Sequence, residues 1–165
     1  MEVTLLGTGD TTGTPTVGCD CGTCQRARDP GLELRERLRG QGGRVTARGG
    51  VERTRFSVHV HNERVGEALL VDFSPDFRRQ FLREDVKLPD AGIVTHIHFD
   101  HLDGLGNAYR VFDSLAVHAA DETDPVTGAS VAETVAEDYA YLDPVTVTRQ
   151  SPFDPFETCG FEVTL

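Results

Sequence analysis

Short apolar runs alternate with polar, glycine-containing connections along most of this 165-residue chain. The runs are rich in aliphatic and β-branched residues and are bounded by turn residues, which predicts strands. Longer segments with apolar residues at helical spacing predict helices between them. The length is compatible with one domain. The pattern predicts strands over 3–6, 56–61, 68–71, 93–95, 115–118, 145–148 and 161–165, and helices over 24–28, 75–83, 102–112 and 130–139.

Residues 35–55 interrupt this pattern because they are rich in glycine and arginine, including the run Arg39-Gly40-Gln41-Gly42-Gly43-Arg44. Such a composition predicts a mobile insertion within the domain. The segment collects much of the positive charge, so it could grip a phosphate or a substrate. A solvated insertion is the simpler interpretation, and we prefer it.

The charge balance is strongly acidic, with 27 acidic against 16 basic residues and a net charge of −11. Lys87 is the sole lysine, and acidity with arginine in place of lysine favours a halophile with a GC-rich genome; an ordinary acidic bacterial protein is the alternative. Acidity argues against a general nucleic-acid binder. No apolar stretch near Met1 is long enough for a signal peptide or a membrane span, so we expect a cytoplasmic protein without membrane contact.

Half of the six histidines fall between residues 96 and 101, where the predicted strand 93–95 ends. In extended chain His96 and His98 point the same way, so both imidazoles can reach one metal ion. Asp100 and His101, at the following bend, project toward a neighbouring position. Imidazole and carboxylate suit zinc, iron or manganese, and two adjacent ligand pairs suit a two-metal centre.

Three thiols form a second cluster, Cys19, Cys21 and Cys24, in the loop over residues 19–24. Thiolates this close can wrap a tetrahedral structural zinc if a fourth ligand arrives from elsewhere. Free thiols or a redox pair are the alternatives, and the loop lacks the strand-to-helix setting of a redox motif. Cys159 is predicted to be a turn residue before a strand rather than the fourth ligand.

The other histidines are interpreted as structural. His59 and His61 alternate along one predicted strand and so share a face, and a polar outer face explains them better than a metal site. His118 ends a predicted strand and could approach the cluster, but we do not assign it as a ligand.

The pattern His-x-His-x-Asp-His after a strand resembles the metallo-β-lactamase fold hydrolases, which include lactamases, glyoxalase II, tRNA 3′-processing endonucleases and phosphodiesterases. The resemblance implies an α/β fold, a four-layer αββα sandwich. It also implies that His96 and His98 bind one metal, and that Asp100 and His101 bind the second.

Together with the cysteine cluster, the turn over residues 5–15 and the segment 69–78 resemble one branch of this superfamily. That branch contains the phosphoribosyl cyclic-phosphate phosphodiesterase of phosphonate breakdown. The protein that makes pyrroloquinoline quinone has a similar cysteine pattern. In this branch Asp72 would hold the metal-binding loop by hydrogen bonds rather than bind metal.

The activity implied is hydrolysis of a small cyclic phosphodiester by a dinuclear metal-bound hydroxide, with two zinc or manganese ions and one structural zinc. Asp100 would also orient or deprotonate the attacking water. The alternatives are a tRNA 3′-processing endonuclease, and a non-catalytic zinc protein or cofactor-biosynthesis accessory protein. The expected partners are a small phosphodiester and a second copy in a homodimer, with nucleic acid less favoured.

The chain departs from this family after His101. Family members need two more histidines and a bridging aspartate after later strands, and only His118 follows here before Leu165. We therefore expect the N-terminal half of an enzyme. Half a sandwich would leave apolar faces uncovered, so we expect the chain alone to be inactive and insoluble or loosely folded.

Overall fold

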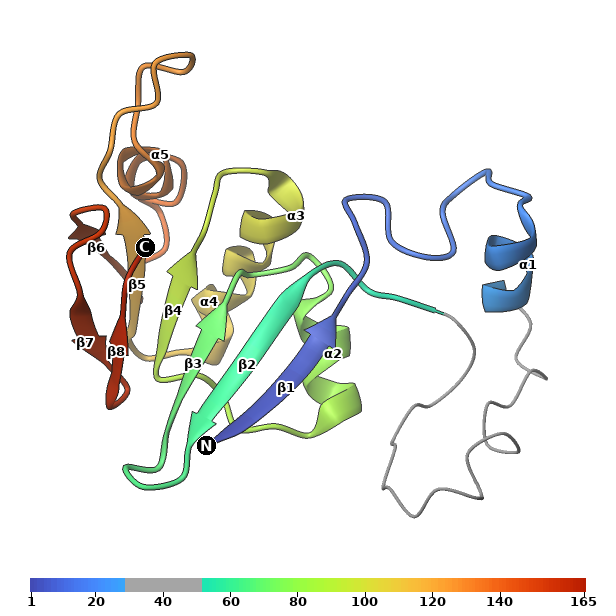
Figure 1. The fold of residues 1–165 in the computed structure, drawn as a ribbon, viewed down its shortest axis with the longest axis horizontal. Helices are drawn as coiled ribbons and strands as arrows, with labels where there is room; N and C mark the ends of the chain where they lie inside the picture. The colour runs from blue at the N-terminus through green and yellow to red at the C-terminus, as the bar shows by residue number, and fades with distance from the viewer. Residues whose placement is uncertain (29–51) are drawn as a thin grey trace.

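The computed structural model describes residues 1–28 and 52–165, and residues 35–51 of the predicted insertion lie outside this part. A six-stranded sheet in the order β1-β2-β3-β4-β5-β6 forms its centre (Figure 1). The strands of this sheet are β1 (Glu2–Gly7), β2 (Ser57–Asn62), β3 (Glu67–Val71), β4 (Ala91–Val94), β5 (Leu115–Ala120) and β6 (Val145–Gln150).

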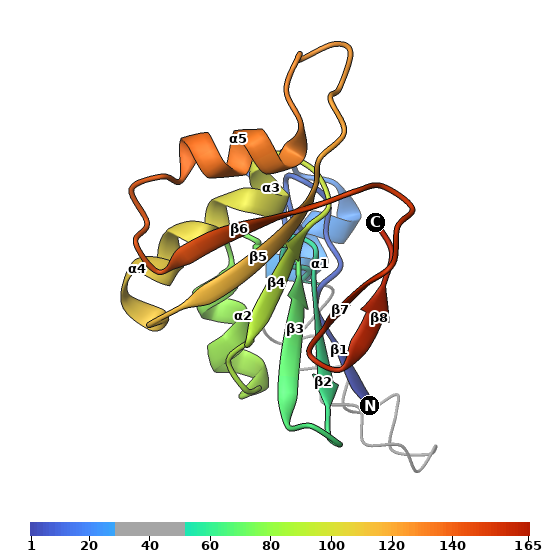
Figure 2. The same ribbon diagram turned by 90° about the vertical axis from the view of Figure 1, so that its left-hand side faces the viewer.

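Helices lie on one face of the sheet and a short hairpin lies on the other (Figure 2). The helices on the sheet are α2 (Phe77–Glu84), α3 (Phe99–Leu102), the 3-10 helix η2 (Asp103–Asn107), α4 (Ala108–Val111) and α5 (Val131–Asp138), whereas α1 (Gly22–Arg28) lies in the connection after β1. The hairpin consists of β7 (Phe156–Thr158) and β8 (Phe161–Val163). Within the described residues, no helix has the length and apolar character needed to cross a membrane.

Strands β3 to β6 run parallel, and β1 and β2 complete the sheet in antiparallel fashion. Parallel strands need crossovers, and helical segments supply each of them: α2 after β3, α3 to α4 after β4, and α5 after β5. The carboxyl ends of β3, β4 and β5 therefore meet at one edge of the sheet. Open α/β sheets place their ligand sites at such an edge.

The main core lies between the sheet and the helices, where Leu6, Leu70, Phe73, Leu105 and Val117 are almost fully buried. A smaller apolar cluster lies on the opposite face of the sheet. There the β7–β8 hairpin covers part of β3 and β4, including Leu69, Ala91 and Ile93.

The same face remains open at β1. Val3 and Leu5 pair with Val60 and Val58, and they are 52% and 60% exposed. The hairpin thus shields the centre of this face and leaves its β1 end accessible to solvent.

The structure differs from the prediction at one predicted helix and at one strand that was not predicted. The helix predicted over 102–112 begins earlier, at Phe99, and is split into α3, η2 and α4. Gly104 lies in the middle segment, where its N–H donates to the carbonyl of Phe73 at 2.8 Å, and glycine is a weak helix former. The strand β7 was not predicted, because three residues with alternating exposure carry too little pattern.

The expectation that His59 belongs to a polar outer face is wrong. His59 is buried under α2, with its ring edge-on to Phe81, and its Nε2 donates to the carbonyl of Lys87 at 2.9 Å. The face of β2 that carries His59 therefore packs against α2. The polar imidazole can be buried there because the backbone carbonyl of Lys87 accepts its hydrogen bond.

Candidate metal centres

Asp72 is the first residue after β3 and is 1% exposed. Its backbone is in the left-handed region with φ 63°, which is uncommon for a residue other than glycine. This conformation directs the carboxylate at the loop after β4, where Oδ1 accepts from the Thr95 N–H at 2.8 Å. Strain of this kind persists where the surroundings hold the residue in place, and it clusters at functional sites.

The Asp72 carboxylate also fixes the ring of His101. The two atoms Asp72 Oδ2 and His101 Nδ1 are 2.7 Å apart. A carboxylate only accepts hydrogen bonds, so Nδ1 carries the proton and Nε2 keeps its lone pair. This pairing of a carboxylate with the remote nitrogen of a histidine is typical of metal-ligating histidines.

Thr95 links the Asp72 carboxylate to the ring of His96 and fixes its tautomer in the same way. Its hydroxyl donates to the Asp72 carboxylate at 2.8 Å and lies 3.0 Å from His96 Nδ1. Because the hydroxyl has a single proton, it accepts from His96 Nδ1–H, and His96 Nε2 is left with a lone pair. Burial lowers the pKa of His96, which favours the neutral, ligand-competent ring.

Asp100, in the first turn of α3, is 2% exposed. Its Oδ2 accepts from the Thr11 hydroxyl at 3.1 Å and lies 3.3 Å from His101 Nε2. Its Oδ1 is buried without any hydrogen-bond partner. A buried carboxylate oxygen without a donor is costly, and here it lies on a carboxylate beside a nitrogen lone pair. This donor set fits a divalent cation.

His98 completes the predicted set and is exposed. Its ring lies edge-on to that of His96, with the centroids 4.7 Å apart, and the His96 and His101 rings are 4.0 Å apart. The structure therefore brings all four predicted ligands to the edge of the sheet where β3 and β4 end. Possible ligand atoms of Asp72, His96 and His101 also lie within 4.8 Å of one another. Because both Asp72 oxygens already accept hydrogen bonds, we interpret Asp72 as orienting the ligands.

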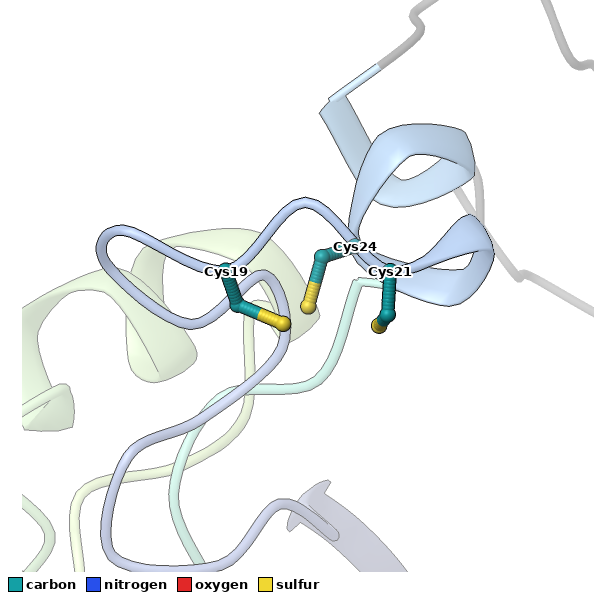
Figure 3. Close-up of side chains that lie close together, drawn as sticks. All are labelled: Cys19, Cys21 and Cys24. Atoms are coloured by element: carbon teal, nitrogen blue, oxygen red, sulfur yellow. The ribbon is translucent and has the colours of Figure 1, made fainter.

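The cysteine cluster forms a separate candidate centre beside α1 (Figure 3). The sulfur atoms of Cys19, Cys21 and Cys24 lie within 4.8 Å of one another. Cys24 is buried and accepts from the Thr16 N–H at 3.4 Å, whereas Cys21 is exposed. The backbone N–H of Cys24 lowers the pKa of Cys21 to about 7, which favours the thiolate. Three sulfur donors in this arrangement fit zinc.

His118 and Cys159 both lie outside the two clusters. His118 lies within β5, where its Nε2 contacts the Thr158 hydroxyl at 3.1 Å and its Nδ1 contacts Gln150 at 2.8 Å, so both nitrogens are engaged away from the cluster. Cys159 lies in the turn between β7 and β8, as predicted, and its thiol donates to the carbonyl of Ala68.

Thr95 and Thr11 are site residues that the sequence analysis missed. Thr95 directly precedes His96, and a hydroxyl beside a ligand could have indicated its role. Thr11 had no such signal, because 89 positions separate it from Asp100.

No protein-family model matches the chain. A curated protein named octanoyltransferase, from Porphyromonas gingivalis (strain ATCC BAA-308 / W83), is 36% identical over 121 residues, which are 72% of this chain and 20% of that protein.

Solved structures match over almost the whole chain. A diphosphatase of the PhnP family superposes with a TM-score of 0.69 and 28% identity, over 97% of this chain and 54% of that one. Zinc-bound PqqB from Methylobacterium extorquens superposes with a TM-score of 0.64 and 21% identity, over 95% and 48%. The short form of human tRNase Z superposes with a TM-score of 0.50 and 17% identity, over 92% of this chain and 45% of that one.

The chain thus spans about half the length of the solved structures that it matches. All three have the architecture implied by the His-x-His-x-Asp-His pattern, and the match extends from β1 to the last strands of this chain. With its mixed sheet, its helices on one face and its histidine loop at the carboxyl end of β4, this chain has the metallo-β-lactamase fold.

Proposed function

We propose that the chain carries the metal-binding part of a hydrolase that cleaves a small cyclic phosphodiester. The observation that carries the proposal is the pair formed by Asp100 and His101, in which a buried carboxylate oxygen without a donor accompanies a nitrogen lone pair. The 28% identity with a PhnP-family diphosphatase supports chemistry on a phosphate substrate. The octanoyltransferase match supports no transfer chemistry, because it covers only a fifth of that protein.

Divalent ions bound at this edge would supply a nucleophilic water at neutral pH and offset the charge that grows on the phosphoryl oxygens. His96 and His98 would hold one ion, and Asp100 and His101 the other. Asp72 fixes the tautomers of His96 and His101, directly and through Thr95, so that each presents Nε2. The donors that complete both coordination spheres would come from the other half of a complete fold.

Asp100 would have a second role beside binding. Thr11 engages only Oδ2, and Oδ1 keeps its capacity to accept a hydrogen bond. An attacking water near this oxygen would be oriented by it and could lose a proton to it.

The test measures metal content and turnover of the protein purified from the cells that naturally produce it. The wild-type protein should hydrolyse bis-p-nitrophenyl phosphate with manganese or zinc. The His96→Ala variant should lose at least roughly a hundredfold in turnover together with metal at the histidine site. His61→Ala is the matched control, since His61 lies on β2 and outside the cluster.

Absent turnover, with metal content unchanged by His96→Ala, would overturn the proposal. Metal at the cysteines alone would instead identify a non-catalytic zinc protein. Cleavage of precursor tRNA in preference to the small diester would identify a tRNA 3′-processing enzyme, which the net charge of −11 disfavours.

A further inference from the structure

A cavity of about 420 Å³ opens directly beside the histidine cluster. One wall is the loop after β4, with His96, Ile97 and His98, and the other is the connection from β5 to α5. This connection protrudes from the sheet at the same edge as the loop after β4 (Figure 1). A substrate whose phosphate reaches the histidine cluster would therefore extend its organic group into this cavity, a step that rests on the proposed function.

Apart from the two histidines, the polar side chains that line the cavity are mainly hydrogen-bond acceptors. Glu122 and Asp124 contribute carboxylates. The Thr127 hydroxyl donates its proton to the carbonyl of Ala129, and the Thr134 hydroxyl donates to the carbonyl of Ser130. Both hydroxyl oxygens therefore remain as acceptors. The lining residues, all in the described part of the chain, include no lysine or arginine.

Several backbone N–H groups that could have bound a phosphate are already satisfied by the chain itself. Asp124 Oδ1 accepts from the N–H groups of Val126 and Thr127, at 2.7 and 3.0 Å. At the start of α5, where an anion would otherwise bind, a capping box engages the N–H groups of Ser130 and Glu133 and places the Glu133 carboxylate there. Hydrogen bonding from the Thr127 N–H lowers the pKa of Asp124, so this carboxylate is charged at neutral pH.

We infer that this cavity receives the organic group of the substrate and selects a neutral, hydroxylated group, such as a sugar ring, over one that carries a second phosphate. Sugar hydroxyls donate to the carboxylates of Glu122 and Asp124, and Ile97 and Val131 contact the apolar face of the ring. A second phosphate would meet two negative charges and no lysine or arginine. Glu122 and Asp124 are thus specificity-determining residues, and the metal ligands hold the reacting phosphate.

Binding of two sugars that differ in one negative charge tests this inference without requiring turnover. The probes are D-glucose and its 6-sulfonate, sulfoquinovose, because a sulfonate is a poor ligand for divalent metals. NMR of the Ile97 and Val131 methyl groups at low ionic strength should show saturable shifts with glucose. Sulfoquinovose should bind at least about fivefold more weakly, as expected for two like charges at this range.

The Glu122→Gln/Asp124→Asn variant should bring the two affinities together. The matched control is Glu137→Gln/Asp138→Asn, which removes the same charge from the exposed far end of α5 and should leave the ratio unchanged. Equal binding of both probes to the wild type, an unchanged ratio in the first variant, or no methyl shift with glucose would each overturn the inference.

The phosphodiesterase assay is read separately on the same samples. Sugar discrimination without turnover, and with metal content unchanged by His96→Ala, would leave the binding preference of the cavity standing and overturn the proposed function. Turnover without sugar binding would do the reverse.

Discussion

Asp72→Asn separates the orienting role of Asp72 from its role in stability. Asparagine has nearly the same shape and tolerates the left-handed conformation with φ 63°. Its amide oxygen can still accept from the Thr95 N–H. Its NH₂ group, however, must donate to His101 Nδ1, which moves the imidazole proton to Nε2. That nitrogen is the one that faces Asp100 and would bind the metal.

The expected loss in metal affinity is roughly 10–100-fold, the usual effect of removing a partner of a ligating histidine. The expected loss in the free energy of unfolding is about 1–2 kcal/mol, because hydrogen bonds to a buried charge are replaced by neutral ones. Competition with a chromophoric zinc chelator measures the affinity, and urea unfolding measures the stability. The control is Asp76→Asn, which weakens the ion pair with Arg55 but touches no predicted ligand. Unchanged zinc affinity in Asp72→Asn, at any stability, would refute the tautomer argument.

Three further substitutions test other parts of the structure. Thr95→Val should lower zinc affinity several-fold by releasing His96 Nδ1, and should cost about 1 kcal/mol in unfolding because the buried Asp72 carboxylate loses a hydrogen bond. Equal zinc affinity of this variant and the wild type would contradict the role of Thr95 in orienting His96. Gly104→Ala should lower the free energy of unfolding in urea by at least about 2 kcal/mol, since the added Cβ would lie 2.2 Å from the Ser74 carbonyl oxygen. Gly106→Ala is the control, because its Cβ would enter open space and the change should be nearly neutral. Burial lowers the pKa of His59, so the unfolded chain takes up the proton first and stability should fall as the pH drops below about 6.5. His59→Gln should reduce this loss of stability between pH 7 and pH 5, as measured by urea titrations. An unchanged pH dependence in the variant would refute the assignment of the loss to His59.

Most of the sheet could be predicted because its strands are short apolar runs between clear turn residues. The runs at 68–71 and 115–118 became β3 and β5 with small changes at their ends. The histidine and cysteine clusters could be found because each lies within six consecutive positions. Ion identity, cytoplasmic location, halophilic origin and dimer formation stay predictions.

Other features depend on contacts that no local pattern encodes. His59 is buried because the carbonyl of Lys87 meets its ring, and 28 positions separate the two residues. The split of the predicted helix 102–112 depends on the approach of Gly104 to the backbone of Phe73. The cavity beside His98 is formed by two connections that are polar in sequence. Polarity alone does not distinguish a loop that lines a substrate cavity from an ordinary surface loop.

The hydrogen bond from Thr11 to Asp100 joins the two candidate metal centres through one stretch of backbone. Thr11 belongs to the connection that also carries Cys19, Cys21 and Cys24. An ion that orders the cysteine loop reduces the freedom of this connection and so favours the position of Asp100. Thermodynamic reciprocity then requires that an ion at the histidine centre tighten the cysteine site by the same factor. A chelator that removes metal from the cysteines would consequently weaken a centre that it never touches.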